Sequence, residues 1–221
     1  MVNYEVDPSL VAALVPRGTE LDRWSGHCYV SIVAFEFLNT RLRGIPIPFY
    51  SNFSEVNLRF YVRREAGSEL RRGVVFVREI VPRRAVAMLA RLLYNEPYIA
   101  LPMRSELRTD ARLGASYAWR LAGRWHSLAA EAPPPRTRPP DGSLEQFIAE
   151  HYWGYTRQRD GTTLEYHVTH PPWSVTPAAT YQVDADLVAT YGSGVASALR
   201  QPASVLLADG SQVSVSAPCP V

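Results

Sequence analysis

Carboxyl groups inside apolar segments are the residues of this sequence best suited to chemistry. Glu55 begins a segment in which polar and apolar residues alternate, and Glu79 follows Arg78 in a segment that is apolar on both sides. A buried carboxyl group is stable only if it is paired, hydrogen-bonded or protonated, and a protonated one can serve as an acid or base. We therefore take Glu55 and Glu79 as candidate catalytic residues.

Basic and polar residues near these carboxyl groups are candidates for ligand binding. Arg83 and Arg84 follow Pro82 in the first turn of a predicted helix, where the helix dipole does not favour cations. This placement suggests a nearby carboxylate, from the protein or from a bound organic acid, which arginine can bind bidentately. The complete set of predicted ligand-binding residues is Asn57, Arg59, Arg78, Arg83, Arg84 and His170.

A structural role is the alternative for the charged residues of the two strands. Arg78 and Glu79 point to opposite faces of an extended segment, so they are not partners of each other. Glu55 and Arg59 on the preceding strand are the complementary candidates, and ion pairs between the strands would satisfy all four groups.

The elements that would position these groups are mostly strands. β-branched and aromatic residues predict strands at 27–38, 55–64 and 73–80, followed by a meander at 98–107, 112–121 and 124–131. In the strand at 55–64, Glu55, Asn57 and Arg59 share one face, which faces either solvent or the lumen of a barrel.

Helical periodicity and capping residues predict a few helices among these strands. Pro82 begins a helix whose apolar residues include Met88, which we expect in the core. Ser143 begins a second helix with a capping box, and Gly154 would end it. Shorter helices are expected at 8–15 and 184–191, and a terminal hairpin is expected from strands at 203–208 and 212–216.

Composition excludes several classes of function. All 23 basic residues are arginine, so no side-chain amine is available to form a Schiff base. The net charge of +2 is too small to indicate nucleic-acid binding, and no apolar run is long enough to span a membrane. The two cysteines form no disulfide framework, which favours the cytoplasm.

Motifs for metals, cofactors and nucleophiles are weak or missing. Glu165, His167 and His170 are the one metal-like group, but their spacing fits no standard motif and we predict no metal site. No phosphate-binding or dinucleotide-binding glycine motif occurs, and no cofactor is predicted. Cys28 has no histidine at a diagnostic spacing, so we do not expect a thiol nucleophile.

Several short motifs, spread over nearly the whole chain, resemble the DUF2071 family, also called YqjF-like. The family belongs to the acetoacetate decarboxylase-like superfamily. The motifs are Asp7-Pro8 with Leu14-Val15-Pro16, Asn57-Leu58-Arg59, Glu79 to Arg83, Tyr94 to Tyr98, Tyr152 to Tyr155, and His170 to Trp173.

The resemblance also implies a difference in chemistry. Acetoacetate decarboxylase uses a Schiff-base lysine beside a second lysine, and these would fall near Arg83 and Arg84. A pocket glutamate of the superfamily would fall near Glu55, whereas Ser31 lies about where another would be. Arginine stays protonated and cannot form an imine, so only ligand binding and acid–base chemistry would remain.

These observations predict a single α+β domain over residues 1–221. It would be mainly β, with an acetoacetate decarboxylase-like antiparallel barrel or cone and about three flanking helices. The leading hypothesis is a pocket that binds a small, acidic organic molecule, with lyase-like or isomerase-like acid–base chemistry. The alternatives are a non-catalytic binding or sensor protein and a structural homo-oligomer.

Overall fold

The computed structural model describes residues 1–42, 45–46, 51–109, 112–134 and 136–221. Its centre is the long antiparallel hairpin of β6 (Phe53–Ala66) and β7 (Glu69–Val81), which turns at Gly67 with a φ angle of 64°. The loop that we expect from the sequence between the strands at 27–38 and 55–64 includes residues 43–44 and 47–50, which lie outside the described residues.

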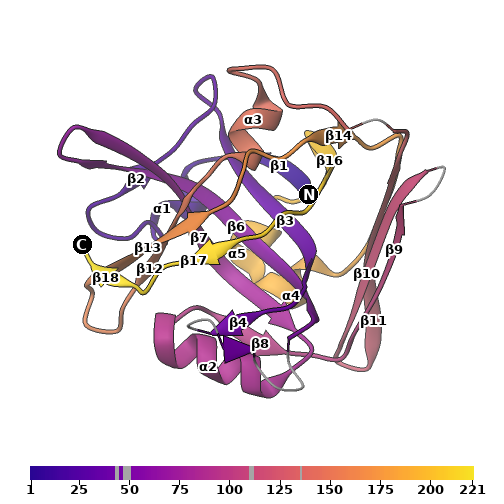
Figure 1. Cartoon of the computed structure of the whole chain (residues 1–221), viewed down its shortest axis with the longest axis horizontal. Helices are drawn as coiled ribbons and strands as arrows, with labels where there is room; N and C mark the ends of the chain where they lie inside the picture. The colour runs from indigo at the N-terminus through magenta and orange to yellow at the C-terminus, as the bar shows by residue number, and fades with distance from the viewer. Residues whose placement is uncertain (43–44, 47–50, 110–111, 135) are drawn as a thin grey trace.

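A curved sheet is built around this hairpin (Figure 1). Its further strands are β1 (Val2–Val6), β3 (Cys28–Phe37), β12 (Trp153–Arg157), β13 (Thr163–Thr169), β14 (Val175–Pro177), β16 (Ser204–Ala208) and β17 (Ser214–Val215). They pair in the order β14-β16-β1-β3-β6-β7-β12-β13-β17. Three short strands attach to it, namely β2 (Glu20–Leu21), β8 (Tyr98–Ala100) and β18 (Cys219–Pro220).

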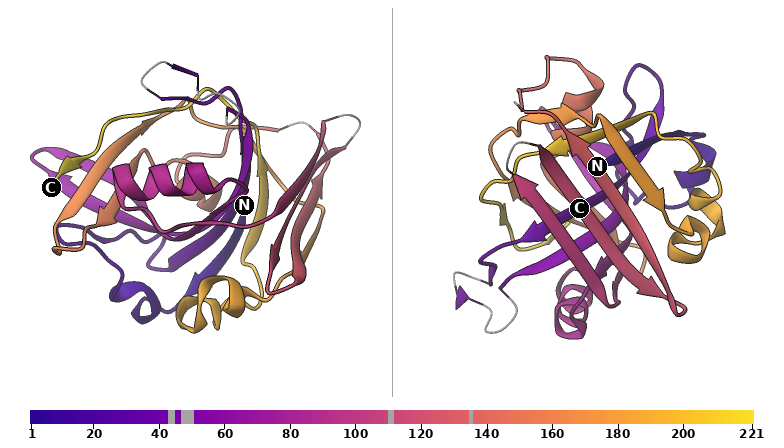
Figure 2. Two further views of the ribbon diagram at one scale, coloured as in Figure 1. Left: turned by 90° about the horizontal axis from the view of Figure 1, so that it is seen from below. Right: turned by 90° about the vertical axis from the view of Figure 1, so that its right-hand side faces the viewer.

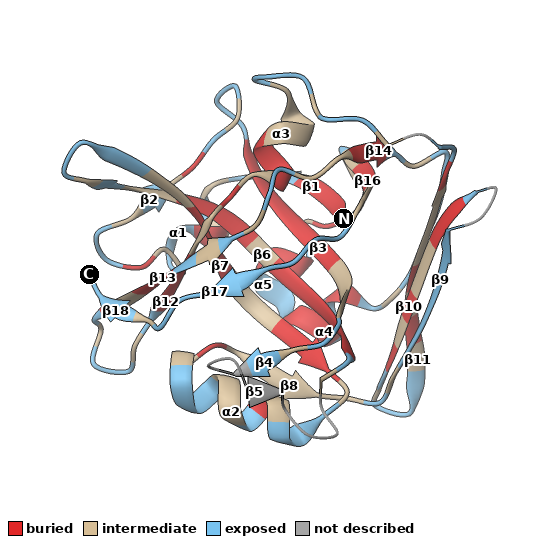
Figure 3. Ribbon diagram, in the orientation of Figure 1, coloured by how far each residue is buried: buried red, intermediate tan, exposed pale blue. Residues whose placement is uncertain are grey.

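A second sheet packs against the first. It is the predicted meander of β9 (Met103–Thr109), β10 (Leu113–Leu121) and β11 (Arg124–Ala132), extended by β15 (Thr180–Asp184). A separate pair is formed by β4 (Arg41–Leu42) and β5 (Ile45–Pro46). The main core includes Leu58 and Phe60 of β6 and Trp119 of β10, all fully buried. Figure 3 shows buried stretches along β3 and β6.

The chain is thus mainly β, as predicted, and within the described residues the strand pairing is antiparallel except at two places. The strand β7 pairs in parallel with β12 and with β8. Within the described residues the sheet path ends at β14 and β17, so the sheet is curved but not closed by pairing.

Five helices occur in the described residues, where about three were expected. They are α1 (Ser9–Ala12), α2 (Arg84–Tyr94), α3 (Leu144–Ala149), α4 (Leu187–Tyr191) and α5 (Ser193–Ala196). The predicted cap of α3 is present, because Ser143 Oγ accepts a hydrogen bond from the Gln146 amide at 3.2 Å. None of these helices has the length and apolar character needed to cross a membrane.

The helix α2 packs on the sheet with a different side from the one that the sequence predicts. Met88, which we expected in the core, is 69% exposed, Leu92 is 79% exposed, and Ala87 is the one buried residue of the helix. The small Ala87 side chain packs with Phe53 and Val81, and Val86 is partly buried beside it, while Met88 and Leu92 are exposed. Figure 2 shows α2 lying across one end of the curved sheet.

Two other predictions are corrected by long-range pairing. The strands predicted at 203–208 and 212–216 do not form a hairpin, because β16 pairs with β1 and β14 while β17 pairs with β13. Gly154 lies inside β12 rather than at a helix end, because α3 already ends at Ala149.

Candidate functional site

Three buried glutamates from separate segments form the candidate site. Glu55, Glu79 and Glu96, here called the carboxyl cluster, are 1%, 2% and 5% exposed. None of them forms an ion pair within the described residues, although arginine is abundant in this chain. The predicted pairing of Arg78 with Glu55 and of Arg59 with Glu79 is therefore not observed.

A one-residue irregularity in the hairpin brings Glu55 and Glu79 to the same face. The register between β6 and β7 shifts at Leu58/Arg59, so that Phe76 pairs with Arg59 but Glu79 pairs with Asn57. Such a β-bulge reverses the inside–outside alternation beyond it. Glu79 consequently shares the face of Asn57 and Glu55.

The segment after α2 supplies the third carboxyl group. Asn95 ends the helix in the left-handed conformation, with a φ of 56°, and its Nδ2 donates to the Arg157 carbonyl oxygen at 3.1 Å. The Pro97 carbonyl oxygen then accepts a hydrogen bond from the Glu79 amide at 3.2 Å. This turn buries Glu96 in the protein interior. It leads into β8, in which Tyr98 is the Cα partner of Glu79.

Hydrogen bonds orient two of the three carboxyl groups. Glu55 accepts from Asn57 Nδ2 at 2.9 Å and from the Tyr98 hydroxyl at 2.8 Å. Glu96 accepts from the Tyr166 hydroxyl at 2.8 Å. The Thr156 hydroxyl also donates to it.

Two acceptor atoms of the site have no hydrogen-bond partner among the described residues. They are Oε2 of Glu79 and Oδ1 of Asn57, and both are buried. The two residues are direct cross-strand partners, so these atoms belong to one small region of the sheet face. Buried polar atoms are normally paired, which makes this region a candidate for ligand contact.

Burial raises the pKa of each carboxyl group in the cluster. It raises the pKa of Glu55 to about 7 despite the hydrogen bonds from Asn57 and Tyr98, and that of Glu96 to about 7 despite those from Thr156 and Tyr166. The pKa of Glu79 is raised well above its usual range, by burial first and then by the charges of Glu55 and Glu96. Near neutral pH the cluster therefore holds protons that it can exchange.

Tyr166 is held in place by a glycine on the neighbouring strand. A Cβ atom at Gly154 would overlap the Tyr166 ring, so only glycine leaves room for it. Because the Tyr166 hydroxyl donates to Glu96, Gly154 indirectly supports the carboxyl cluster.

The comparisons with known proteins agree with this fold. The family model DUF2071, described as an uncharacterized conserved protein, matches residues 1–212. The chain belongs to the DUF2071 family. The uncharacterized protein YqjF of Bacillus subtilis (strain 168) is 31% identical over 176 residues, which cover 77% of this chain and 69% of YqjF.

Solved structures show which fold the DUF2071 chain has. An acetoacetate decarboxylase-like enzyme from Sphingomonas wittichii RW1 matches with a TM-score of 0.65 and 12% identity, over 100% of this chain and 88% of that one. The enduracididine biosynthesis enzyme MppR complexed with pyruvate matches with a TM-score of 0.59 and 13% identity, over 94% and 80%. The predicted acetoacetate decarboxylase-like fold is thus confirmed.

The predicted ligand-binding residues of this family member lie in different places. Asn57 is in the site, whereas Arg59 extends toward α3, donating to the Ile148 carbonyl oxygen at 3.2 Å. Arg78 lies on the opposite face of the sheet and donates to the Thr190 carbonyl oxygen in α4. Asn57 therefore belongs with the carboxyl cluster and Arg78 does not, while Arg59 acts on the cluster through its charge, which lowers the pKa of Glu55.

The remaining predicted residues also lie apart from the buried group. Arg83 and Arg84 are exposed at the start of α2. His170 is half-buried between aromatic rings, 4.1 Å from the Trp173 ring centre and 4.9 Å from that of Tyr152. Burial lowers its pKa, so His170 is neutral near pH 7.

The candidate metal ligands Glu165 and His167 have other partners. Glu165 forms ion pairs with Arg64 at 3.1 Å and Arg71 at 2.5 Å, and His167 stacks on Trp153 at 4.6 Å. In the part of the chain that is described, no group of three or more potential metal ligands converges.

Sequence reasoning missed Glu96, Tyr98 and Tyr166 as site residues. The run Tyr-Asn-Glu-Pro-Tyr from Tyr94 to Tyr98 was an available signal, since a helix-ending asparagine and a proline can turn the glutamate between them inward. Tyr166 offered no such signal, because its contact with Glu96 spans 70 residues of sequence.

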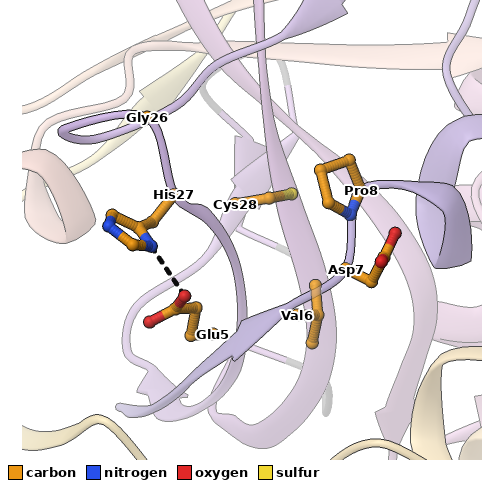
Figure 4. Close-up of a pocket in the computed structure, with 7 residues that line it drawn as sticks. All are labelled: Glu5, Val6, Asp7, Pro8, Gly26, His27 and Cys28. Atoms are coloured by element: carbon orange, nitrogen blue, oxygen red, sulfur yellow. Dashed lines mark hydrogen bonds and ion pairs between the residues drawn. The ribbon is translucent and has the colours of Figure 1, made fainter.

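A hollow in the surface lies away from the carboxyl cluster. It has a volume of about 400 Å³ and is lined by Glu5, Val6, Asp7, Pro8, Gly26, His27 and Cys28 (Figure 4). His27 Nδ1 lies 2.6 Å from Glu5 Oε1 at its edge. Burial raises the pKa of the Cys28 thiol, so this hollow contains no activated nucleophile.

Proposed function

We propose that the carboxyl cluster is an acid–base site that acts on a small organic molecule. The observation that carries this proposal is the burial of three carboxyl groups that form no ion pair among the described residues. Carboxyl groups in such surroundings keep protons near neutral pH, and a proton donor and acceptor side by side suit lyase-like or isomerase-like chemistry.

The two strand glutamates differ in how they are held, which suggests different roles. Glu55 is fixed by Asn57 and Tyr98, so its orientation is set before a ligand arrives. Glu79 has an oxygen without a partner and retains its proton most strongly. We assign Glu79 the role of acid and Glu55 the role of base.

Imine chemistry is not part of the proposal. The decarboxylase-like relatives share the fold, but this sequence contains no lysine whose amine could attack a carbonyl group. The exposed positions of Arg83 and Arg84 also weaken the sequence argument for an acidic ligand. The pyruvate bound to MppR supports a small organic ligand for this fold.

Several broader expectations belong to the same proposal. We propose a single domain over 1–221, and a cytoplasmic location because Cys28 and Cys219 are both free. We propose no nucleic-acid partner, given the net charge of +2. Homo-oligomerisation stays a proposal to be tested by the mass of the protein in solution.

A non-catalytic binding or sensor role is the second candidate function. It is favoured by the same two buried acceptors, Oε2 of Glu79 and Oδ1 of Asn57, because they call for a ligand whether or not the ligand reacts.

A metabolite screen with matched variants tests the proposal. Glu55→Gln and Glu79→Gln keep the side-chain shape but remove the exchangeable carboxyl proton. We expect either change to lower turnover by about 100-fold or more, while Glu106→Gln on the exposed strand β9 leaves it unchanged. Turnover that survives both cluster changes would refute the acid–base site, and binding without turnover would favour the sensor role.

A further inference from the structure

We propose that the ligand of the carboxyl cluster is a small organic cation, such as a primary ammonium group, bound by Glu79 and Asn57. This inference rests on the proposed function, because it names the class of ligand that the same site would take. It differs from the sequence expectation of an acidic ligand.

The first argument is the sign of the charge that the site can offer. Glu55, Glu79 and Glu96 are buried together; the charges of Glu55 and Glu96 raise the pKa of Glu79, and the charge of Glu55 raises the pKa of Glu96. No ion pair within the described residues neutralises any of them. An incoming cation would supply the missing charge, whereas a carboxylate would add to the repulsion.

The second argument is the kind of hydrogen-bonding atom left over. Oε2 of Glu79 and Oδ1 of Asn57 have no partner among the described residues, and both are acceptors when Glu79 is ionised. Burial favours the protonated form of Glu79, and a bound cation would reverse this by stabilising the carboxylate. Nε of Arg59, on the same strand face, is also buried without a partner, but this guanidinium group is directed to the Ile148 carbonyl oxygen. Asn57 is 1% exposed, and its Nδ2 donates to Glu55 at 2.9 Å, so this side chain points into the cluster. An ammonium group has three donors and no acceptor, which complements these atoms.

The third argument concerns the arginines that could have bound an anion. Arg59 extends toward α3, where its guanidinium carbon lies 5.6 Å from the Tyr61 ring centre. Arg78 is on the opposite face, and Arg84 is exposed at the start of α2. None of these three guanidinium groups therefore forms an ion pair with the cluster among the described residues, although the positive charge of Arg59 lowers the pKa of Glu55.

The test compares three probes of equal chain length, namely butylammonium, butyrate and butanol. Thermal shift and calorimetric titration at constant ionic strength would measure their binding to the full chain. We expect butylammonium to bind and raise the melting temperature, and the other two to leave it unchanged. Glu79→Gln should weaken butylammonium binding at least tenfold, while Glu106→Gln should not affect it.

The pH dependence supplies a second readout that needs no variant. An ammonium group is bound by ionised carboxyl groups, and burial raises the pKa of Glu55 and that of Glu96 to about 7 and that of Glu79 well above its usual range. Butylammonium should therefore bind about tenfold more tightly at pH 8 than at pH 6. Binding that does not change with pH, or that Glu79→Gln leaves intact, would overturn the inference.

The remaining outcomes separate this inference from the proposed function. If butyrate binds and this binding is lost in Glu79→Gln, the proposal of a cationic ligand is refuted, but the carboxyl cluster remains a binding site. Failure of all three probes would also refute the cation, and the metabolite screen with Glu55→Gln would then decide alone whether the acid–base site exists.

Discussion

The hydroxyl group of Tyr98 donates a hydrogen bond to Oε2 of Glu55 at 2.8 Å, although β7 lies between their two strands. Glu79 occupies the position between them on β7, as the Cα partner of Asn57 on one side and of Tyr98 on the other. Three neighbouring strands thus contribute adjacent polar side chains to one buried patch, and burial sets their protonation.

Glu55→Gln should change the pH dependence of stability. The folded-state pKa of about 7 exceeds the usual 4.5, so the stabilising effect of protonated Glu55 is complete below pH 4.5 and lost as pH rises to 7. Relative to the wild type, the variant should gain about 3 kcal/mol of unfolding free energy between pH 4.5 and pH 8. Urea unfolding at several pH values measures this gain. For the control Glu106→Gln, the difference in unfolding free energy from the wild type should not change with pH.

Glu165→Gln should behave in the opposite way from Glu55→Gln. Glu165 is also buried, but it is paired with Arg64 and Arg71, which the change would leave without their partner. Breaking such a pair costs about 3 kcal/mol or more. If Glu165→Gln stabilised the protein at pH 8 while Glu55→Gln destabilised it, our distinction between paired and unpaired carboxyl groups would be wrong.

Gly154→Ala should destabilise the protein, because the new methyl group would overlap the Tyr166 ring. Overpacking of this kind costs about 1–3 kcal/mol, and it would also disturb the hydrogen bond from Tyr166 to Glu96. Gly210→Ala is the matched control, since no atom lies within 4 Å of its added Cβ. Equal unfolding free energies for the two variants would contradict the packing described for Gly154.

Acid should weaken the protein through His151. This side chain is buried against Tyr61 and Phe147, and burial lowers its pKa from 6.5 to about 4, although Asp22 accepts a hydrogen bond from it. The contribution of neutral His151 is complete above pH 6.5 and lost as pH falls toward 4, by about 3 kcal/mol.

His151→Phe tests this acid sensitivity. The variant removes the titrating ring and leaves Asp22 paired with Arg72 at 2.7 Å. The stability difference between wild type and variant should therefore shrink from pH 7 to pH 4 in urea titrations. A difference that grows on acidification would mean that His151 is protonated in the folded protein.

Met88→Ala should have little effect on stability. Met88 is 69% exposed, so we expect a change within about 0.5 kcal/mol. Leu58→Ala, in the fully buried centre of β6, should cost about 2–5 kcal/mol. Comparable losses at the two positions in urea unfolding would show that the apolar side of α2 is covered in solution.

The sequence by itself determined the features that depend on local patterns. Alternation along β6 separates Leu58 and Phe60 from Glu55 and Asn57, because side chains of a strand alternate between faces. The capping residue Ser143 begins α3 where it was predicted, because its hydroxyl satisfies an amide within three residues. The family resemblance and the absence of lysine can also be read from the sequence alone.

Only the tertiary structure decided which of these side chains meet. Strict alternation along β7 would have placed Arg78 on the face of Asn57, but the bulge opposite Leu58/Arg59 puts Glu79 there instead. The choice of Ala87 as the contact of α2, and the reach of Tyr166 to Glu96, depend on segments that are distant in sequence. A one-residue shift in strand register therefore determines whether the patch is cationic or acidic, because it reverses which side chains face inward.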